Sequence, residues 1–236
     1  LLWFLTQVGL VEVVFRHTET VAGWSKWQVV LLIGTHQLVT QLFFAFCFVN
    51  LANLPELIRT GKLDFFLIQP VSSQFAVSFK QFGFDSLVNA LIGLAFILAA
   101  CWHLSLVPTA GQVALFGLAA TAAMVAHYGL AFLLISTAFW IVQGQGLLYG
   151  YFTTMNLARY PDTVYRPVPR LLRLALSTLV PVLVVSNVPA RLLGGIFEGP
   201  NLAAASLLLA GSTVWLLGFS KWFWDFSLKR YTSASS

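Results

Sequence analysis

Two long stretches without Asp, Glu, Lys or Arg limit how this chain can fold more than any other feature of its sequence. Lys26 and Glu56 enclose 29 such residues, and Asp85 and Arg159 enclose 73. Because an α-helix rises about 1.5 Å per residue, about 20 apolar residues are enough to cross the hydrocarbon core of a bilayer. The shorter stretch therefore has room for one membrane-spanning helix, and the longer stretch has room for more than one.

The composition of the whole chain supports a membrane protein built from helices. Of its 236 residues, 58% are hydrophobic and 9% are charged, and the mean hydropathy is +0.84. A soluble domain has about 45–50% apolar residues, and this length has room for about five or six spans but not for an additional soluble domain. We predict an all-α integral membrane protein of one domain (residues 1–236) with six spans, the first incomplete at its N-terminus. The expected spans are residues 1–16, 29–50, 79–102, 113–142, 172–189 and 202–220.

The basic residues are distributed unevenly between the two sides of this predicted topology. The net charge is +5. Lys and Arg are enriched in cytoplasmic loops, and no basic cluster is dense enough to indicate nucleic-acid binding. With the loop around Gly61 in the cytoplasm, three basic residues face outward: Arg16, Lys26 and Arg191. Ten face the cytoplasm: Arg59, Lys62, Lys80, Arg159, Arg166, Arg170, Arg173, Lys221, Lys229 and Arg230. We therefore expect both termini in the cytoplasm.

Polar residues recur on one side of the second predicted span, at His36, Gln37, Thr40 and Gln41. Polar side chains at this depth face protein or a water-filled cavity rather than lipid. Hydrogen bonding between helices is the interpretation that we favour, and lining of a substrate path is the alternative. His127, in the fourth span, is expected to be a packed neutral histidine, because no second ligand lies four residues away to form a metal site.

Asp85, near the start of the third predicted span, is the most informative intramembrane charge. An unpaired carboxylate inside a membrane is strongly unfavourable, and Lys80 and Asn89 are close enough in sequence to satisfy it. An ion pair at the membrane boundary is the simpler interpretation, and a substrate contact is the alternative.

Prolines interrupt the fifth predicted span. Pro181 lies in its middle and Pro189 near its end, and proline bends or breaks a helix because it lacks a backbone N–H. Residues 194–200, which follow, are expected to form a hairpin-like segment.

The residues between the second and third predicted spans combine charges with helix signals. Asn53 can cap a short helix that has Pro55 in its first turn and Glu56 three residues after the cap. Gly61 supplies a left-handed stop, and Asp64 can cap a second short turn. We predict two short helical pieces across the end of a membrane bundle, with an amphipathic interfacial loop as the simpler alternative.

This stretch resembles the first cytoplasmic loop of ABC-2-type transporter permeases. The resemblance rests on the order G-x-L-D-x-x-L-x-x-P, here Gly61, Leu63, Asp64, Leu67 and Pro70. Residues 159–165, continuing to residues 180–190, agree with it, as does the ending at residues 223–231. The three stretches occur in the right order and extend, with the intervening chain, over about residues 23–231. The most similar branch pairs with a separate ATPase and often with a second, related permease.

The resemblance implies a permease subunit of an ATP-binding cassette transporter, commonly an exporter, in the inner (plasma) membrane. Two permease chains, identical or related, would form the pathway, and ATP and Mg²⁺ would be held by separate ATPase subunits. The family also has re-entrant helices between the fifth and sixth spans, and an interfacial helix before the first. The residues that would couple to the ATPase are Glu56, Ile58, Arg59, Gly61, Lys62, Leu63, Asp64, Leu67 and Pro70. The candidate pathway or intramembrane polar residues are His36, Gln37, Gln41, Asp85 and Asn89.

Catalytic chemistry is not evident in this sequence. A phosphate-cradling loop ends in Gly-Lys-Ser or Gly-Lys-Thr, and none of the five lysines is followed by Ser or Thr. No Ser-His-Asp order, metal-ligand cluster or paired carboxylate stands out, so we expect neither enzyme activity nor a cofactor on this chain. The alternative function is an ATP-independent secondary carrier or channel-like protein, which should show several intramembrane charges or discontinuous helices.

Overall fold

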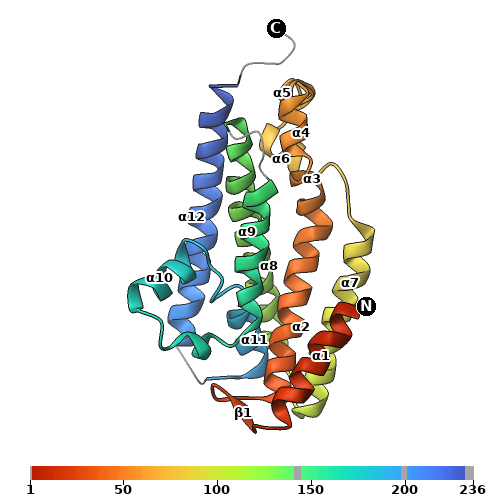
Figure 1. Ribbon diagram of the computed structural model, residues 1–236, viewed down its shortest axis with the longest axis vertical. Helices are drawn as coiled ribbons and strands as arrows, with labels where there is room; N and C mark the ends of the chain where they lie inside the picture. Colours follow the sequence, from red (N-terminus) through yellow and green to blue (C-terminus); the bar gives the residue numbers. More distant parts are fainter. Residues whose placement is uncertain (1, 141–144, 198–200, 232–236) are drawn as a thin grey trace.

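The computed structural model describes residues 2–140, 145–197 and 201–231, which form a mostly helical bundle with one small β-hairpin (Figure 1). The long helices are α2 (Lys26–Phe43), α7 (Phe84–His103), α8 (Ala110–Ser136) and α12 (Leu202–Leu228). The shorter elements are α1 (Leu2–Phe15), β1 (Thr20–Val21), β2 (Trp24–Ser25), η1 (Phe44–Phe48), α3 (Val49–Leu51), α4 (Leu54–Arg59), α5 (Asp64–Leu67), α6 (Ser73–Ser78), η2 (Thr137–Phe139), α9 (Gln145–Met155), η3 (Asn156–Arg159), η4 (Asp162–Tyr165), α10 (Arg170–Thr178) and α11 (Asn187–Gly194). The elements α4, α5 and α6 lie at the top of Figure 1 and the hairpin at the bottom. We call these the α4–α6 end and the β-hairpin end.

Within the described residues, four helical segments are long and apolar enough to cross a membrane: Lys26–Arg59, Phe84–His103, Ala110–Phe139 and Leu202–Leu228. They correspond to the second, third, fourth and sixth predicted spans. The third begins later than predicted, because residues 79–83 are not helical, and residues 141 and 142 of the fourth lie outside the described residues. The helix at the first predicted span, α1, has 14 residues. The count of six spans stays a prediction.

Glycines allow the long helices to pack closely in pairs. A Cβ on Gly34 of α2 would lie 2.9 Å from the carbonyl oxygen of Gly93 in α7, and a Cβ on Gly93 would lie 2.7 Å from the backbone nitrogen of Leu38. In the same way a Cβ on Gly129 of α8 would lie 3.0 Å from Cβ of Leu216 in α12. Small residues at helix crossings bring backbones into van der Waals contact, so α2 with α7 and α8 with α12 form two tightly packed pairs.

The hairpin between α1 and α2 is a two-residue turn. Strands β1 and β2 pair antiparallel with Thr20 opposite Ser25, and the turn residues Ala22 and Gly23 have φ angles of 52° and 89°. Positive φ at both central residues is the requirement of a type I′ turn. Trp24, directly after the turn, is completely buried and holds the hairpin against the bundle.

The chain does not form one helix over residues 172–189, where the fifth span was predicted. Helix α10 ends at Thr178, before Pro181, whereas Pro189 lies in the first turn of α11. Proline is disfavoured within a helix because it cannot donate the next hydrogen bond, but the first turn needs no such donor. The bend between the two helices is buried, with Val182 and Val185 fully enclosed. The re-entrant hairpin before the last span stays a prediction, and residues 198–200 lie outside those described.

The helix that leads back from the α4–α6 end is α9, which the sequence analysis did not count as a span. It is followed by η3, η4 and α10, away from the α4–α6 end (Figure 1). Arg159 donates a hydrogen bond to Gln7 of α1, with 3.2 Å between Nη1 and Oε1. Arg173 and Asn201 line the same cavity, and Asn201 directly precedes the first turn of α12. Residues 156–178 therefore lie away from the α4–α6 end.

This placement shows that the predicted ten-to-three charge count is wrong. Arg159, Arg166, Arg170 and Arg173 belong to or directly follow η3, η4 and α10, which lie away from the α4–α6 end, so the ten basic residues do not lie together on one side. The error arose because α9 has only 11 residues and lacks the long apolar run by which a span is identified. The orientation of the chain is therefore not decided by the count of Lys and Arg.

A buried ion pair between Arg191 and Asp162 joins α11 to η4. Nη1 of Arg191 lies 3.1 Å from Oδ2 of Asp162, and the two side chains are 0% and 6% exposed. Nε of Arg191 donates to the carbonyl of Ile196, while Asn187 accepts from the backbone N–H of Asp162 and donates to the carbonyl of Tyr160. Burial raises the pKa of the Asp162 carboxyl, and the Arg191 guanidinium opposes that rise. The sequence analysis had placed Arg191 in an outer connection.

We expect Arg191→Met to lower the free energy of unfolding by about 3–5 kcal/mol, because it leaves the Asp162 carboxylate buried without its cation. The double variant Arg191→Met, Asp162→Leu should lose less than the single variant, because both charges are removed together. Thermal unfolding of the purified protein in detergent measures both effects. The single variant Asp162→Leu completes the comparison. If the double variant loses as much free energy of unfolding as the two single variants together, the two side chains do not stabilise each other.

Candidate functional site

The α4–α6 end is built around a glycine turn. Gly61 has a φ of 69°, the left-handed conformation expected of it, and this allows the N–H of Leu63 to donate to the carbonyl of Leu57 at 3.1 Å. Leu54, Leu63 and Phe66 are buried and attach α4 and α5 to the bundle core. Two short helices therefore follow each other across this end, with Gly61 between them.

The capping residues expected here have other roles. Asn53 precedes α4 in a helical conformation, with φ −87° and ψ −10°, and its side chain donates back to the carbonyl of Val49. A capping side chain requires an extended backbone, so Asn53 cannot cap α4. Glu56 forms a two-point ion pair with Arg59, at 2.8 and 2.9 Å, instead of a capping box. Asp64 is the first residue of α5 and does not precede it, a position that favours a carboxylate through the helix dipole.

The remaining coupling candidates divide into buried and exposed groups. Ile58 packs against the core beside the buried Leu63, whereas Lys62, Leu67 and Pro70 are exposed. Phe65 and Ile68, which the sequence analysis did not select, are 68% and 80% exposed. Phe65 and Phe66 are adjacent in the sequence, and only the packing of α5 shows which of them points outward. The result is an exposed apolar surface with basic residues beside it.

Two contacts connect this end to the long helix that begins with α2. The side chain of Asn50 donates to the carbonyl of Gln81 and accepts from its N–H, both at 2.9 Å. One step further along, the N–H of Gly83 donates to the carbonyl of Ala45 at 2.8 Å. Ala45 belongs to the π-helical turn η1, where i→i+5 hydrogen bonding replaces the usual pattern. The connection from α6 to α7 is therefore held against the helix that carries α4. The sequence analysis missed these contacts, because nothing local predicts that Asn50 faces Gln81.

A polar cavity of about 280 Å³ lies along α2, nearer the middle of the bundle. His36, Gln37, Thr40 and Gln41 line it from α2, and α8 and α9 contribute His127 and Tyr151. Nδ1 of His127 lies 2.7 Å from the hydroxyl of Tyr151, and Nδ1 of His36 lies 3.1 Å from Oγ of Ser186. The predicted polar stripe thus meets two other helices and the bend before α11.

Several polar atoms in this cavity have no protein partner. Nε2 of Gln37, Oγ1 of Thr40 and Nε2 of His127 are buried without a hydrogen bond to any described residue. Buried polar groups are nearly always paired with protein or with water, so water or a solute is the natural partner here. Interhelical hydrogen bonding accounts for His36, whereas Gln37 and Thr40 fit the lining of a path.

Asp85 and Asn89 are not part of this cavity. Asp85 is exposed in the first turn of α7, where the helix dipole favours a carboxylate. No described residue forms a salt bridge with it, and Lys80 instead lies over the ring of Phe66, 5.7 Å from its centroid. Asp85 therefore lies at the end of the span, as the simpler interpretation held, but without the ion pair.

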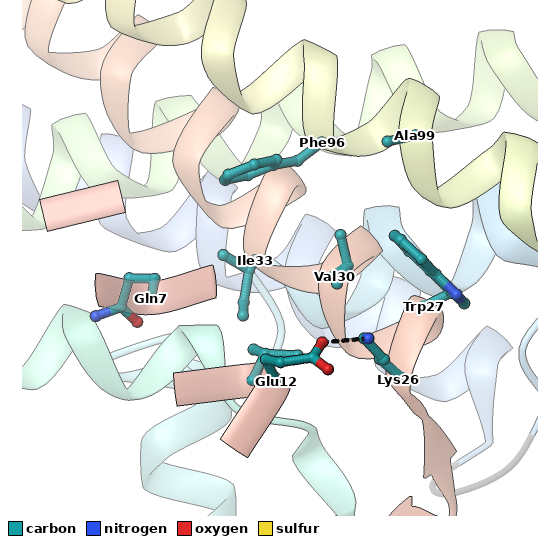
Figure 2. Close-up of a pocket in the computed structure, with 9 residues that line it drawn as sticks. Gln7, Glu12, Lys26, Trp27, Val30, Ile33, Phe96 and Ala99 are labelled. Atoms are coloured by element: carbon teal, nitrogen blue, oxygen red, sulfur yellow. Dashed lines mark hydrogen bonds and ion pairs between the residues drawn. The ribbon is translucent and has the colours of Figure 1, made fainter. Parts of the chain in front are cut away.

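Another cavity, of about 280 Å³, lies between α1, α2 and α7 (Figure 2). Its walls are largely apolar, with Trp27 and Phe96 among them, and the carboxylate of Glu12 points toward the ammonium of Lys26. Because these two charges satisfy each other, neither is left free to orient a polar solute. Among the described residues no group of three His, Cys, Asp or Glu side chains is placed to hold a metal ion.

Comparison with known proteins agrees with this arrangement. The model of the family described as ABC-2 family transporter protein matches residues 1–235. No curated protein and no solved structure matches the chain. The match extends over nearly the entire length and includes the long apolar helices and the short helices at the α4–α6 end. The chain therefore belongs to the ABC-2 family of transporter proteins, the membrane-spanning permease components of ABC transporters.

Proposed function

We propose that this chain forms the substrate pathway of an ABC exporter and docks on separate ATPase subunits through its α4–α6 end, which lies in the cytoplasm of the cell. One observation carries the proposal. The helical segment Lys26–Arg59 contributes α4 to that end and His36, Gln37 and Thr40 to the polar cavity. A displacement of α4 is therefore transmitted along a single element to the cavity.

The surface of the α4–α6 end has the chemistry of a protein interface. Phe65 and Ile68 are large apolar side chains exposed to the surroundings, and Lys62 and the Glu56–Arg59 pair lie at neighbouring positions. Interfaces take most of their affinity from a few such apolar anchors, surrounded by polar groups. Gly61 sets the angle between α4 and α5, so it sets how these anchors are presented.

Coupling then follows from the contacts behind this surface. Asn50 holds Gln81, and Ala45 in η1 holds Gly83, so α4–α6 and the start of α7 move with the segment that begins with α2. When ATP draws the ATPase subunits together, we propose that this end shifts as a rigid body. The π-helical turn adjusts the helix where α2 meets the cavity.

The chain needs a second permease, identical or related, to enclose a pathway. Two ATPase subunits are related by a two-fold axis, and closed two-fold assembly is the common solution for a membrane partner. ATP and Mg²⁺ bind on the ATPase subunits, because this sequence has no phosphate-cradling loop of its own. We therefore propose that the permease catalyses no reaction and holds no cofactor.

Thiol labelling tests the orientation. In a background with Cys47→Ser and Cys101→Ser, a cysteine replacing Thr60 at the α4–α6 end should resist membrane-impermeant thiol reagents in intact cells. A cysteine replacing Val107, which is 92% exposed between α7 and α8, should react fully. Labelling of the Thr60→Cys variant from outside, with protection of Val107→Cys, would reverse the proposed topology.

Docking is tested with Phe65→Glu and Ile68→Glu. Each places a charge in the proposed contact and should weaken ATPase association about tenfold or more, because a lost interface anchor costs about 2 kcal/mol. Abundance should be unchanged, because both side chains are exposed. Val107→Glu is the matched control at the other end and should retain the ATPase on co-purification. If an ATP-independent carrier is the correct function, both variants transport normally.

The pathway is tested with Gln37→Met, which keeps the side-chain size but removes the unpartnered amide. Stability should change by less than about 1 kcal/mol, because no hydrogen bond is broken, while transport should fall. Thr121→Val, on the exposed face of α8, removes a hydroxyl outside the cavity and should transport normally. The measurement is survival of cells challenged with the compounds that become toxic when the gene is deleted. Normal survival with Gln37→Met would mean that the cavity is not part of the path.

A further inference from the structure

A separate cavity of about 450 Å³ lies between η4, α10 and the first turns of α12. Its polar lining includes Arg170, Arg173 and Asp162, and its apolar lining includes Leu174 and Leu208. It shares no lining residue with the polar cavity along α2. From the sequence its arginines were expected on the cytoplasmic side, and the function proposed above does not use them.

The two arginines bring positive charge that no described acidic side chain neutralises. Arg170 and Arg173 are three residues apart on α10 and so share one face of the helix. Neither forms a salt bridge with a described residue, and Nε of Arg173 is buried without a hydrogen-bond partner. The guanidinium geometry matches the oxygens of a phosphate or carboxylate.

Asp162 does not cancel this charge, because its Oδ2 is bound by Arg191. Its side chain is more than nine-tenths buried, and its other oxygen, Oδ1, has no side-chain partner among the described residues. A carboxylate oxygen accepts hydrogen bonds. Asp162 can therefore accept one from a hydroxyl or an ammonium group of a ligand that lies beside the two arginines. The N-terminus of α12, which Asn201 caps through the N–H groups of Ala203 and Ala204, adds a further partial positive charge.

The surroundings of the arginines are apolar and open. Leu171, Leu172 and Leu174 of α10 are 80%, 51% and 50% exposed, and Leu174 also lines the cavity. In a membrane protein such a face contacts acyl chains, while arginines on the same helix reach a charged headgroup. A free anion would use the arginines but would leave the leucines without a role.

We propose that this cavity binds the phosphate group of an amphiphile, with Arg170 and Arg173 on the phosphate, Asp162 on a neighbouring hydroxyl or ammonium, and the acyl chain along the leucines of α10. A phospholipid or a phospholipid-like cargo has this chemistry. The proposal does not depend on the ATPase partner or on transport, so it is tested on the purified chain.

The full chain, purified in a maltoside detergent, is titrated with three probes: dihexanoyl phosphatidylglycerol, inorganic phosphate, and dihexanoylglycerol with the same acyl chains and no phosphate. Binding is measured by native mass spectrometry and by the shift in the thermal unfolding midpoint. Phosphatidylglycerol should bind saturably and raise the midpoint, and the other two probes should bind at least tenfold more weakly. Arg170→Gln and Arg173→Gln should each weaken phosphatidylglycerol binding about tenfold, as expected for the loss of a charge-assisted hydrogen bond.

Arg230→Gln, which removes the same charge at the α4–α6 end, should bind like the wild type and so controls for net charge. Arg170 is exposed, so its replacement tests the site even if Arg173→Gln impairs folding. Equal binding of phosphate alone would show an anion site without an amphiphile, and equal binding of dihexanoylglycerol would show an apolar groove; either result overturns the proposal. Wild-type affinity in both α10 variants would also overturn it.

Discussion

The β-hairpin half of this structure depends on an ion pair that is withdrawn from water. Arg191 and Asp162 are 29 residues apart in the sequence, and both side chains are buried where they meet. Burying an ion costs several kcal/mol even after relaxation, and the carbonyl of Ile196, which accepts a hydrogen bond from Nε of Arg191, offsets part of that cost. Asn187 accepts from the backbone N–H of Asp162 and so holds that residue in place. The pair fixes η4 against α11 and so sets α10 beside the start of α12. The cavity between η4, α10 and α12 is lined by Asp162 itself, and the buried bend lies directly before α11, so both adjoin this ion pair.

In contrast to this paired cluster, α2 carries buried polar atoms that have no partner among the described residues. Gln37 and Thr40 face the cavity with a polar atom that has no partner among the described residues, which is tolerated in a membrane helix where water or a solute can enter. The same helix is in close contact with α7 through Gly34 and Gly93, and it becomes π-helical at η1. A firmly packed first half and an adjustable turn are what a helix requires if it must move at one end while holding its position in the bundle.

Local sequence patterns predicted the long helices and the turn at Gly61, but they did not predict how the short helices and individual side chains pack. Charge-free length located α2, α7, α8 and α12, because a spanning helix must satisfy its own backbone whatever packs against it. The turn at Gly61 likewise follows from the sterics of one residue. Helix α9 was not counted among the predicted spans, because it is short and contains glycines and hydroxyl side chains. The pairing of Arg191 with Asp162, and the outward position of Phe65 beside the buried Phe66, depend on tertiary packing that no local pattern encodes.

The kind of basic residue differs between two parts of the chain. The connection from η3 to α11 contains five arginines and no lysine, whereas Lys62 lies just before α5 and Lys80 just after α6. A lysine ammonium is compact and strongly hydrated, whereas a guanidinium is weakly hydrated and keeps its planar contacts when buried. Counting charges to assign topology assumes that they lie in solvated loops, and Arg191, buried, and Arg159, bonded to Gln7, do not meet that assumption. A cytoplasmic α4–α6 end is therefore part of the docking proposal and does not follow from a count of charges.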